Sequence, residues 1–223
     1  MKAEQALPLV GATIVVGLTA QWLVLLAFDP AAARGIAAGV TAEVLTGREG
    51  GIPVGLQAGA PPLLMFEFSV GQDLVGVCFG YPLFLYALHR YHDRDNFAMR
   101  RVRAIEAAAE RRRHFVDRWG PLGLFAFMLV PFLVNGPLVG AVLGRLTGIP
   151  TKHLILPIIA ATTVAAAAWT FALDRTFRLT NAVDPRIGYV IAGGVVAVIA
   201  IGSLVAWLRE RRLAAVEAPT QDD

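Results

Sequence analysis

One glycine-rich segment of the sequence carries residue types that could do chemistry. Glu43, Arg48 and Glu49 lie close together between two apolar stretches, and Gln57 follows near the end of the second stretch. The guanidinium of Arg48 is a forked donor that suits phosphate or carboxylate. The glycines beside it let the backbone turn and expose N–H groups to an anion. The segment therefore predicts a substrate-binding site that contains Arg48, Glu49 and Gln57.

A structural interpretation of the same residues stays open. Arg48 and Glu49 are adjacent and could form an ion pair at a loop tip, in the headgroup region of a membrane. Glu43 lies one arm deeper and has no cationic neighbour in the sequence. A charge at membrane depth is costly unless it is paired or faces water. Glu43 is therefore a candidate for proton coupling, whatever the role of the pair.

Two further carboxylates, Glu67 and Asp73, lie inside the long apolar stretch 63–88. Carboxylates within a membrane often form proton relays, so both are candidates for proton coupling. Their spacing of six positions places them about 240° apart around a helix, so they do not share one face. The alternative for either residue is a structural bond to a neighbouring helix or to Arg145.

Asn135 and Arg145 are polar residues of a second interrupted apolar stretch, and they complete the predicted substrate-binding set. Asn135 lies at the interruption, where an amide can also satisfy freed backbone groups in a turn. Arg145 lies near the end of the outgoing arm. It either extends to the membrane interface or pairs with a carboxylate of the first segment.

The sequence contains no phosphate-binding loop, nucleophile elbow or zinc motif. His89 and His92 have a spacing that permits metal binding on a helix, but Arg90 and Arg94 flank them and disfavour a cation. We therefore expect no catalytic residue, no metal site and no cofactor, and we expect that the protein is not an enzyme.

The composition places these residues in a membrane. Hydrophobic residues make up 56% of the 223 residues and charged residues only 17%, whereas soluble domains carry about 25% charged residues. A membrane-spanning helix needs about 20 mostly apolar residues. Four blocks meet this requirement, namely 7–28, 63–88, 151–173 and 187–208.

Two other apolar stretches, 35–62 and 120–146, are interrupted in the middle by glycine, proline and polar residues. Their arms are about 10 residues long, which corresponds to half of a hydrocarbon core about 30 Å thick. This pattern predicts two re-entrant helical hairpins. A kinked continuous span is the alternative for each stretch.

The charge distribution orients these elements. Residues 88–118 contain nine arginines and five acidic residues, so the positive-inside rule predicts that this loop is cytoplasmic. The stretches 35–88 and 120–173 then have the same plan in opposite orientation, as in transporters with inverted repeats. The predicted fold class is an all-α membrane protein with about four transmembrane helices and two inverted re-entrant hairpins. One integral membrane domain covers residues 1–223, with a hairpin plus helix at 35–88, a basic cytoplasmic loop at 89–118 and a second hairpin plus helix at 120–173.

Two motifs resemble those of a known family. The run from Glu43 through Arg48-Glu49-Gly50-Gly51 to Ile52-Pro53 is similar to the Glu-x-Arg-Gly-Ala-Ile-Pro motif of the small multidrug export family. Residues 130–141 are similar to its second motif, Pro-x-Pro-Gly-Thr-Gly-x-x-x-Gly-Ala. Order, spacing and hairpin context agree over roughly 35–173.

That family resembles, more distantly, the DedA (VTT-domain) superfamily, which has two inverted re-entrant hairpins. The resemblance implies the same fold, and it implies movement of a lipid or amphiphile. The second hairpin of DedA proteins carries arginines, whereas residues 128–134 of this chain contain none. Arg48 and Arg145 are therefore the remaining candidates to bind a phosphate.

These observations predict a small, proton-coupled secondary transporter or flippase for a lipid-linked phosphate or another amphiphile. The alternative is an uncoupled lipid scramblase or membrane-organising protein. The expected partners are membrane lipids, with anionic headgroups at the basic loop and a proton gradient as energy source. A homo-oligomer stays open, and no nucleic acid is expected. The predicted location is the inner (plasma) membrane of a bacterium or archaeon, with a multi-pass topology.

Overall fold

The computed structural model describes residues 3–91, 120, 122–126, 128–129 and 137–216. Within these residues the chain forms helices joined by short turns, and it contains no strand. The predicted all-α class is therefore confirmed. The helices are α1 (Ala3–Phe28), α2 (Pro30–Thr46), α3 (Arg48–Gln57), α4 (Pro62–Tyr91), α7 (Pro137–Leu146), α8 (Thr151–Asn181) and α9 (Pro185–Val216).

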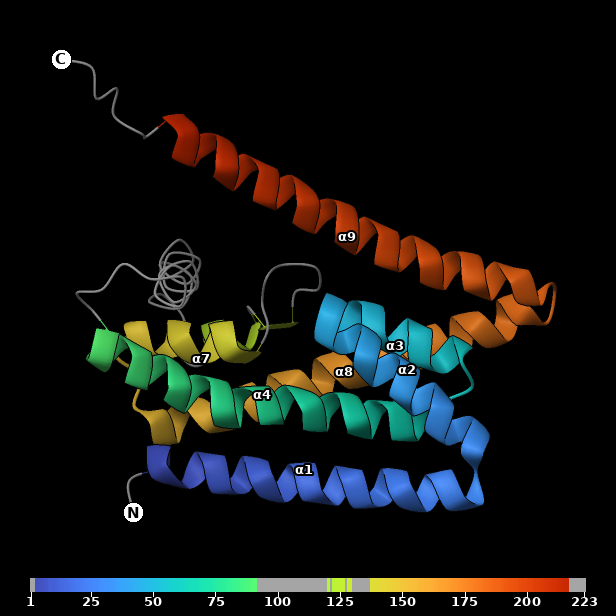
Figure 1. Ribbon diagram of the computed structural model, residues 1–223, viewed down its shortest axis with the longest axis horizontal. Helices are drawn as coiled ribbons and strands as arrows, with labels where there is room; N and C mark the ends of the chain where they lie inside the picture. The colour runs from blue at the N-terminus through green and yellow to red at the C-terminus, as the bar shows by residue number, and fades with distance from the viewer. Residues whose placement is uncertain (1–2, 92–119, 121, 127, 130–136, 217–223) are drawn as a thin grey trace.

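Three helices are long and apolar enough to cross a membrane. These candidate spans are Ala6–Phe28 in α1, Pro62–Tyr86 in α4 and His153–Asn181 in α8. They confirm three of the four predicted spans. In α9, the apolar section among the described residues is the shorter Arg186–Gly202. Figure 1 shows that α9 runs obliquely away from the other helices. The fourth predicted span, 187–208, stays a prediction.

The first interrupted stretch forms two helices because local signals start and stop them. The side chain of Asp29 accepts a hydrogen bond from the backbone N–H of Ala32 (3.0 Å), and Pro30 begins α2. This is a favourable helix start. Gly47 ends α2 with a positive φ of 77°, which glycine adopts without strain. The predicted first arm was about 10 residues, but α2 has 17 because this start lies well before the apolar run.

α2 and α3 pack back to back as a helical hairpin. A Cβ atom on Gly39 would lie 2.9 Å from the Cα of Gly55, and one on Gly51 would lie 2.7 Å from the Cα of Glu43. These pairs run in opposite directions along the two helices, so the helices are antiparallel. The predicted helix–break–helix pattern is confirmed, whereas its re-entrant placement in a membrane stays a prediction.

Gly51→Ala should destabilise the protein by about 1–3 kcal/mol, because overpacking forces backbone shifts. The new methyl group would meet the backbone of Glu43, which cannot rotate away. Gly17→Ala is the matched control, since nothing lies within 4 Å of its Cβ position and alanine favours a helix. Thermal unfolding of both variants in one detergent measures the difference. Equal stability would contradict the close packing of α2 on α3.

Residues on either side of the second interruption also pack against each other. A Cβ atom on Gly140 would lie 2.7 Å from the Sδ atom of Met128, and one on Gly144 would lie 3.3 Å from Leu124. This spacing makes α7 antiparallel to the helical residues 122–126 and 128–129. The interruption itself, with Asn135, lies outside the described residues. The inverted repeat of the two hairpins stays a prediction.

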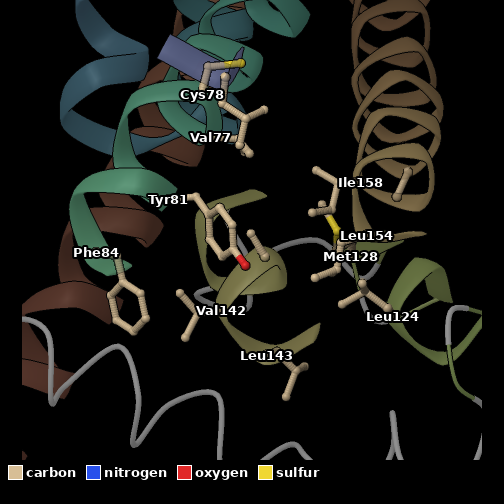
Figure 2. Packing of buried hydrophobic residues seen from close by; sticks show 13 residues of the cluster. Val77, Cys78, Tyr81, Phe84, Leu124, Met128, Val142, Leu143, Leu154 and Ile158 are labelled. Carbon is tan, nitrogen blue, oxygen red and sulfur yellow. The ribbon is translucent and has the colours of Figure 1, made fainter. Parts of the chain in front are cut away.

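The buried core is divided into two apolar clusters. One cluster joins the second half of α4 to α7 and α8, and Figure 2 shows Tyr81, Val142, Met128 and Ile158 among its residues. The other joins the α2–α3 hairpin to α4, α8 and α9 around Ile52. In Figure 1 the α2–α3 hairpin and α7 lie toward opposite ends of α4. The turn between α2 and α3 therefore lies between the two clusters.

Cysteine labelling tests the predicted topology. In a Cys78→Ala background, a cysteine at Val183, which is 82% exposed after α8, should react only with a reagent outside the cell. Cysteines at Asn96 and Gln221 should react only from the cytoplasmic side, because both hairpins are predicted not to cross. If Val183 and Asn96 were labelled from the same side, the scheme would be wrong.

Candidate functional site

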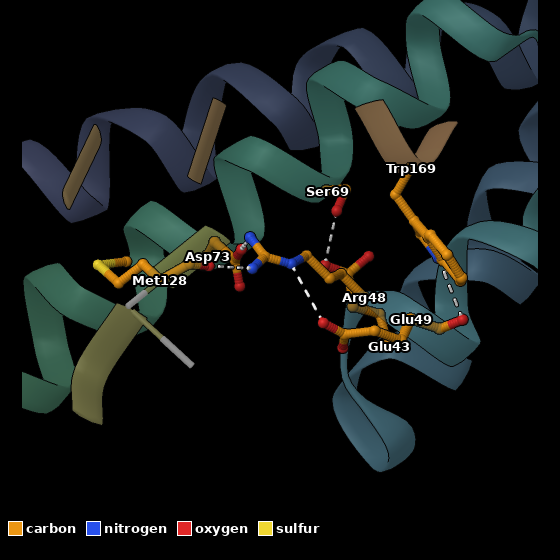
Figure 3. Close-up of polar contacts among 7 residues, drawn as sticks. All are labelled: Glu43, Arg48, Glu49, Ser69, Asp73, Met128 and Trp169. Carbon is orange, nitrogen blue, oxygen red and sulfur yellow. Dashed lines mark hydrogen bonds and ion pairs between the residues drawn. The ribbon is translucent and has the colours of Figure 1, made fainter. Parts of the chain in front are cut away.

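Arg48 connects three elements of the fold. It begins α3, and its side chain is 7% exposed. Its Nε donates to Glu49 Oε1 (3.4 Å), its Nη1 to Asp73 Oδ2 (3.3 Å) and its Nη2 to the carbonyl of Met128 (3.4 Å), as Figure 3 shows. All three distances are longer than the 2.7–2.9 Å of strong charged hydrogen bonds. The guanidinium is therefore shared among loose partners and is not locked to one of them.

Glu43 lies beside this guanidinium and is 5% exposed. Its Oε1 accepts a hydrogen bond from Ser69 Oγ at 2.8 Å, whereas its Oε2 is buried and has no partner. Burying an ionised carboxylate without full hydrogen bonding is costly. The unpartnered oxygen is therefore a place where a proton or a water molecule could bind.

The cluster lies at middle depth along α4. Asp73 is eleven residues after the start of α4 at Pro62, and a rise of about 1.5 Å per residue puts it about 16 Å along the helix axis. This distance is about half of a hydrocarbon core of about 30 Å. If α4 spans the membrane, Asp73 and Arg48 lie near its midplane.

A small cavity opens beside the charged groups. Its volume is about 180 Å³. It is lined by Arg48, Glu49, Leu129, Ala165, Ala168 and Trp169. The indole Nε1 of Trp169 donates to the backbone carbonyl of Glu49 at 3.3 Å, which fixes the ring beside the turn (Figure 3). A ligand group in this cavity would contact the guanidinium and an aromatic ring together.

The structure brings together four of the predicted site residues, namely Glu43, Arg48, Glu49 and Asp73. It places Glu67 elsewhere: this residue is exposed, and its Oε2 accepts a hydrogen bond from Gln21 at 3.0 Å. The predicted separation of Glu67 and Asp73 onto different faces of one helix agrees with this arrangement.

Three predicted substrate-binding residues do not join the cluster among the described residues. Gln57 lies at the far end of α3, where its Nε2 and the Oδ1 of Asn181 both face Gly188 of α9. Arg145 is exposed near the end of α7, and none of the described contacts joins it to a carboxylate of the first hairpin. Asn135 lies outside the described residues.

Three contributors to the site were missed in the sequence. Ser69 precedes Asp73 by four positions, so helical periodicity would have put both on one face of α4. The carbonyl of Met128 has no sequence signal, because any residue supplies the same group. Trp169 lies 120 residues after its hydrogen-bond partner Glu49, and only the packing of α8 brings it there.

The chain matches a known protein family. The family described as "Putative small multi-drug export protein" matches residues 48–168, which include Arg48, Ser69, Asp73 and Met128. The chain belongs to this family. The match covers more than half of the 223 residues. No curated protein and no solved structure is significantly similar to the chain.

Membership of the small multi-drug export family agrees with the three candidate spans. The protein is therefore a membrane protein. The description of its family names export, which is a transport role rather than an enzymatic one. The more distant relationship to the DedA superfamily stays a prediction.

Proposed function

We propose that the protein is a proton-coupled secondary transporter, a flippase for an amphiphile with an anionic headgroup such as a lipid-linked phosphate. One observation carries the proposal. The buried guanidinium of Arg48 bonds Asp73 of α4, Glu49 of its own hairpin and the carbonyl of Met128 in the second hairpin. Both hairpins and one span thus meet at a single charge.

The balance of charge supports proton uptake. Among the described residues, three carboxylates, from Glu43, Glu49 and Asp73, lie around the guanidinium of Arg48. If all three were ionised, the cluster would carry a net negative charge at membrane depth, which is unfavourable. Protons on the carboxylates remove this excess charge. Glu43 and Asp73 are the candidate proton carriers, because Oε2 of Glu43 has no partner and protonation of Asp73 would also release a donor of Arg48.

The same contacts couple protons to the headgroup. Protonation of Asp73 removes its charge and weakens its bond to Arg48. An arginine has five N–H donors, and three of those of Arg48 are used by the protein. The released donors can bind a phosphate in a forked geometry. Proton and anion would then bind together.

The change of hydrogen-bond partners at Arg48 would also alter the contact between the two hairpins. Because Arg48 donates to the carbonyl of Met128, a headgroup that draws the guanidinium into the cavity would loosen the contact between the hairpins. Rocking of one repeat against the other around a fixed central site is a common mechanism of alternating access. We expect this movement to expose the cavity to one side at a time.

The location and lipid contacts form part of the proposal. We expect the protein in the inner (plasma) membrane of a bacterium or archaeon. The basic stretch 89–118 should then face the cytoplasm and attract anionic headgroups. Most of this stretch lies outside the described residues.

Reconstitution in liposomes tests the proposed function. The probes are fluorescently labelled dodecyl phosphate and labelled dodecyltrimethylammonium, with and without an imposed pH gradient. We expect the phosphate to move faster when protons are supplied on the side from which it is taken. Movement that ignores the gradient would replace the transporter by the scramblase. Movement of the ammonium probe alone would show that the headgroup is cationic and overturn the role of Arg48.

A further inference from the structure

A second cavity lies against a neighbouring face of α4, next to the face that carries the charged cluster. It has a volume of about 360 Å³ and lies between α1, α2 and α4. Cavities that bind small molecules usually have about 300–1,000 Å³. Its walls are uncharged and mostly apolar, and they include Trp22, Ile36, Val40 and Phe68. We call it the α1–α2 groove.

The setting of the groove indicates what can occupy it. Two of its three walls, α1 and α4, are candidate membrane spans, and the lining residues of α4 lie near the middle of that helix. The indole of Trp22 donates to the carbonyl of Ala33 at 3.0 Å and ties α1 to α2 along one wall. Where α1 and α4 span a membrane, the surrounding medium at this depth is lipid hydrocarbon. The groove is therefore suited to an alkyl chain.

One polar group in the groove requires a hydrogen-bond donor, which hydrocarbon does not supply. Gln72 lines it, and its side-chain Oε1 is buried without a hydrogen-bond partner. An unpaired amide oxygen at membrane depth is costly, because lipid chains supply no donor. The terminal torsion of glutamine is broad, so the amide can turn toward a ligand. A ligand that carries a donor next to its alkyl chain would satisfy it.

We propose that the α1–α2 groove binds the alkyl chain of the transported amphiphile, with Gln72 accepting a hydrogen bond from a hydroxyl or amine of that molecule. This inference rests on the proposed function and adds where the apolar part of the substrate binds. Gln72 precedes Asp73 directly in α4, and Val40 precedes Glu43 by one helical turn. The groove and the charged cluster thus share two helices, so one molecule can contact both.

Fluorescence quenching tests the groove without any transport step. The full chain carries Trp22 as its one tryptophan, with Trp119, Trp169 and Trp207 replaced by phenylalanine, and is reconstituted in nanodiscs. The probes are 12-bromododecan-1-ol and 1-bromododecane, which differ in the hydroxyl donor. Both should quench Trp22 with saturation, and the alcohol should bind tighter at equal concentration in the bilayer.

Two substitutions locate the binding. Gln72→Leu should weaken alcohol binding by about three- to tenfold, the effect of one hydrogen bond, and leave the bromoalkane unchanged. Ala37→Phe should fill the groove and remove the saturable quenching of both probes. Ala31→Phe, at an exposed position of the same helix, is its control and should change neither.

Other results would overturn the inference. Quenching that rises linearly with probe concentration would mean simple partition into the bilayer, and equal effects of Ala37→Phe and Ala31→Phe would exclude the groove. If Ala37→Phe does not fold, Val15→Phe in the groove is compared with Val16→Phe beside it. Because this test uses no gradient and no charged probe, saturable binding would survive a failure of the proposed proton coupling. Gradient-driven transport would equally survive a failure of the groove.

Discussion

Arg48→Ala should abolish transport of labelled dodecyl phosphate. The substitution removes the guanidinium that lines the cavity among the described residues, and it leaves Glu49 and Asp73 without their shared cation. Breaking a buried ion pair on one side typically costs about 3–5 kcal/mol, so stability should fall as well. Transport rates in liposomes, normalised to folded protein measured by size exclusion, separate loss of activity from loss of fold.

Arg48→Lys distinguishes charge from geometry. Lysine keeps the positive charge but loses the fork, so we expect binding of the phosphate probe to weaken by about 10- to 100-fold while the protein stays folded. Arg34→Ala is the matched control, since Arg34 is exposed on α2. Wild-type transport by Arg48→Ala would leave Arg48 with only a structural role at the turn.

Asp73→Asn and Glu43→Gln should keep the fold, because each amide nearly preserves the size of the acid. At least one of them should move the phosphate probe at a rate that no longer responds to the pH gradient. The physical reason is that an amide cannot take up and release the proton that we propose to neutralise the cluster. Binding of the probe to Arg48 should remain largely intact.

Two further variants serve as controls for this result. Glu67→Gln changes another carboxylate of α4, and because Glu67 is exposed and bonded to Gln21, it should respond to the gradient like the unmodified protein. Glu49→Gln should weaken probe binding, because without its ion pair to Glu49 the guanidinium of Arg48 would be misplaced relative to the cavity. If Asp73→Asn and Glu43→Gln both respond to the gradient as the unmodified protein does, proton coupling through these residues is wrong.

Much of the architecture was predictable because its signals are local. Continuous apolar blocks predicted α1, α4 and α8, and the glycines after Glu43 predicted the break between α2 and α3. The adjacency of Arg48 and Glu49 also left an ion pair open as an alternative, and the structure contains this pair. Each of these signals lies within one helix or one turn. The family was recognisable in the sequence for the same reason, since its motifs are short and continuous.

The tertiary structure decided which charges meet. For Asp73, the structural alternative to proton coupling was a bond to a neighbouring helix or to Arg145, and it pairs with Arg48 of the neighbouring α3, 25 positions away in the sequence. The carbonyl of Met128 reaches the same guanidinium from 80 positions away. Periodicity tells which face of a helix a residue occupies, but it does not tell which helix covers that face. That choice depends on the close packing of whole helices, here at the glycines of both hairpins, and only the folded chain contains it.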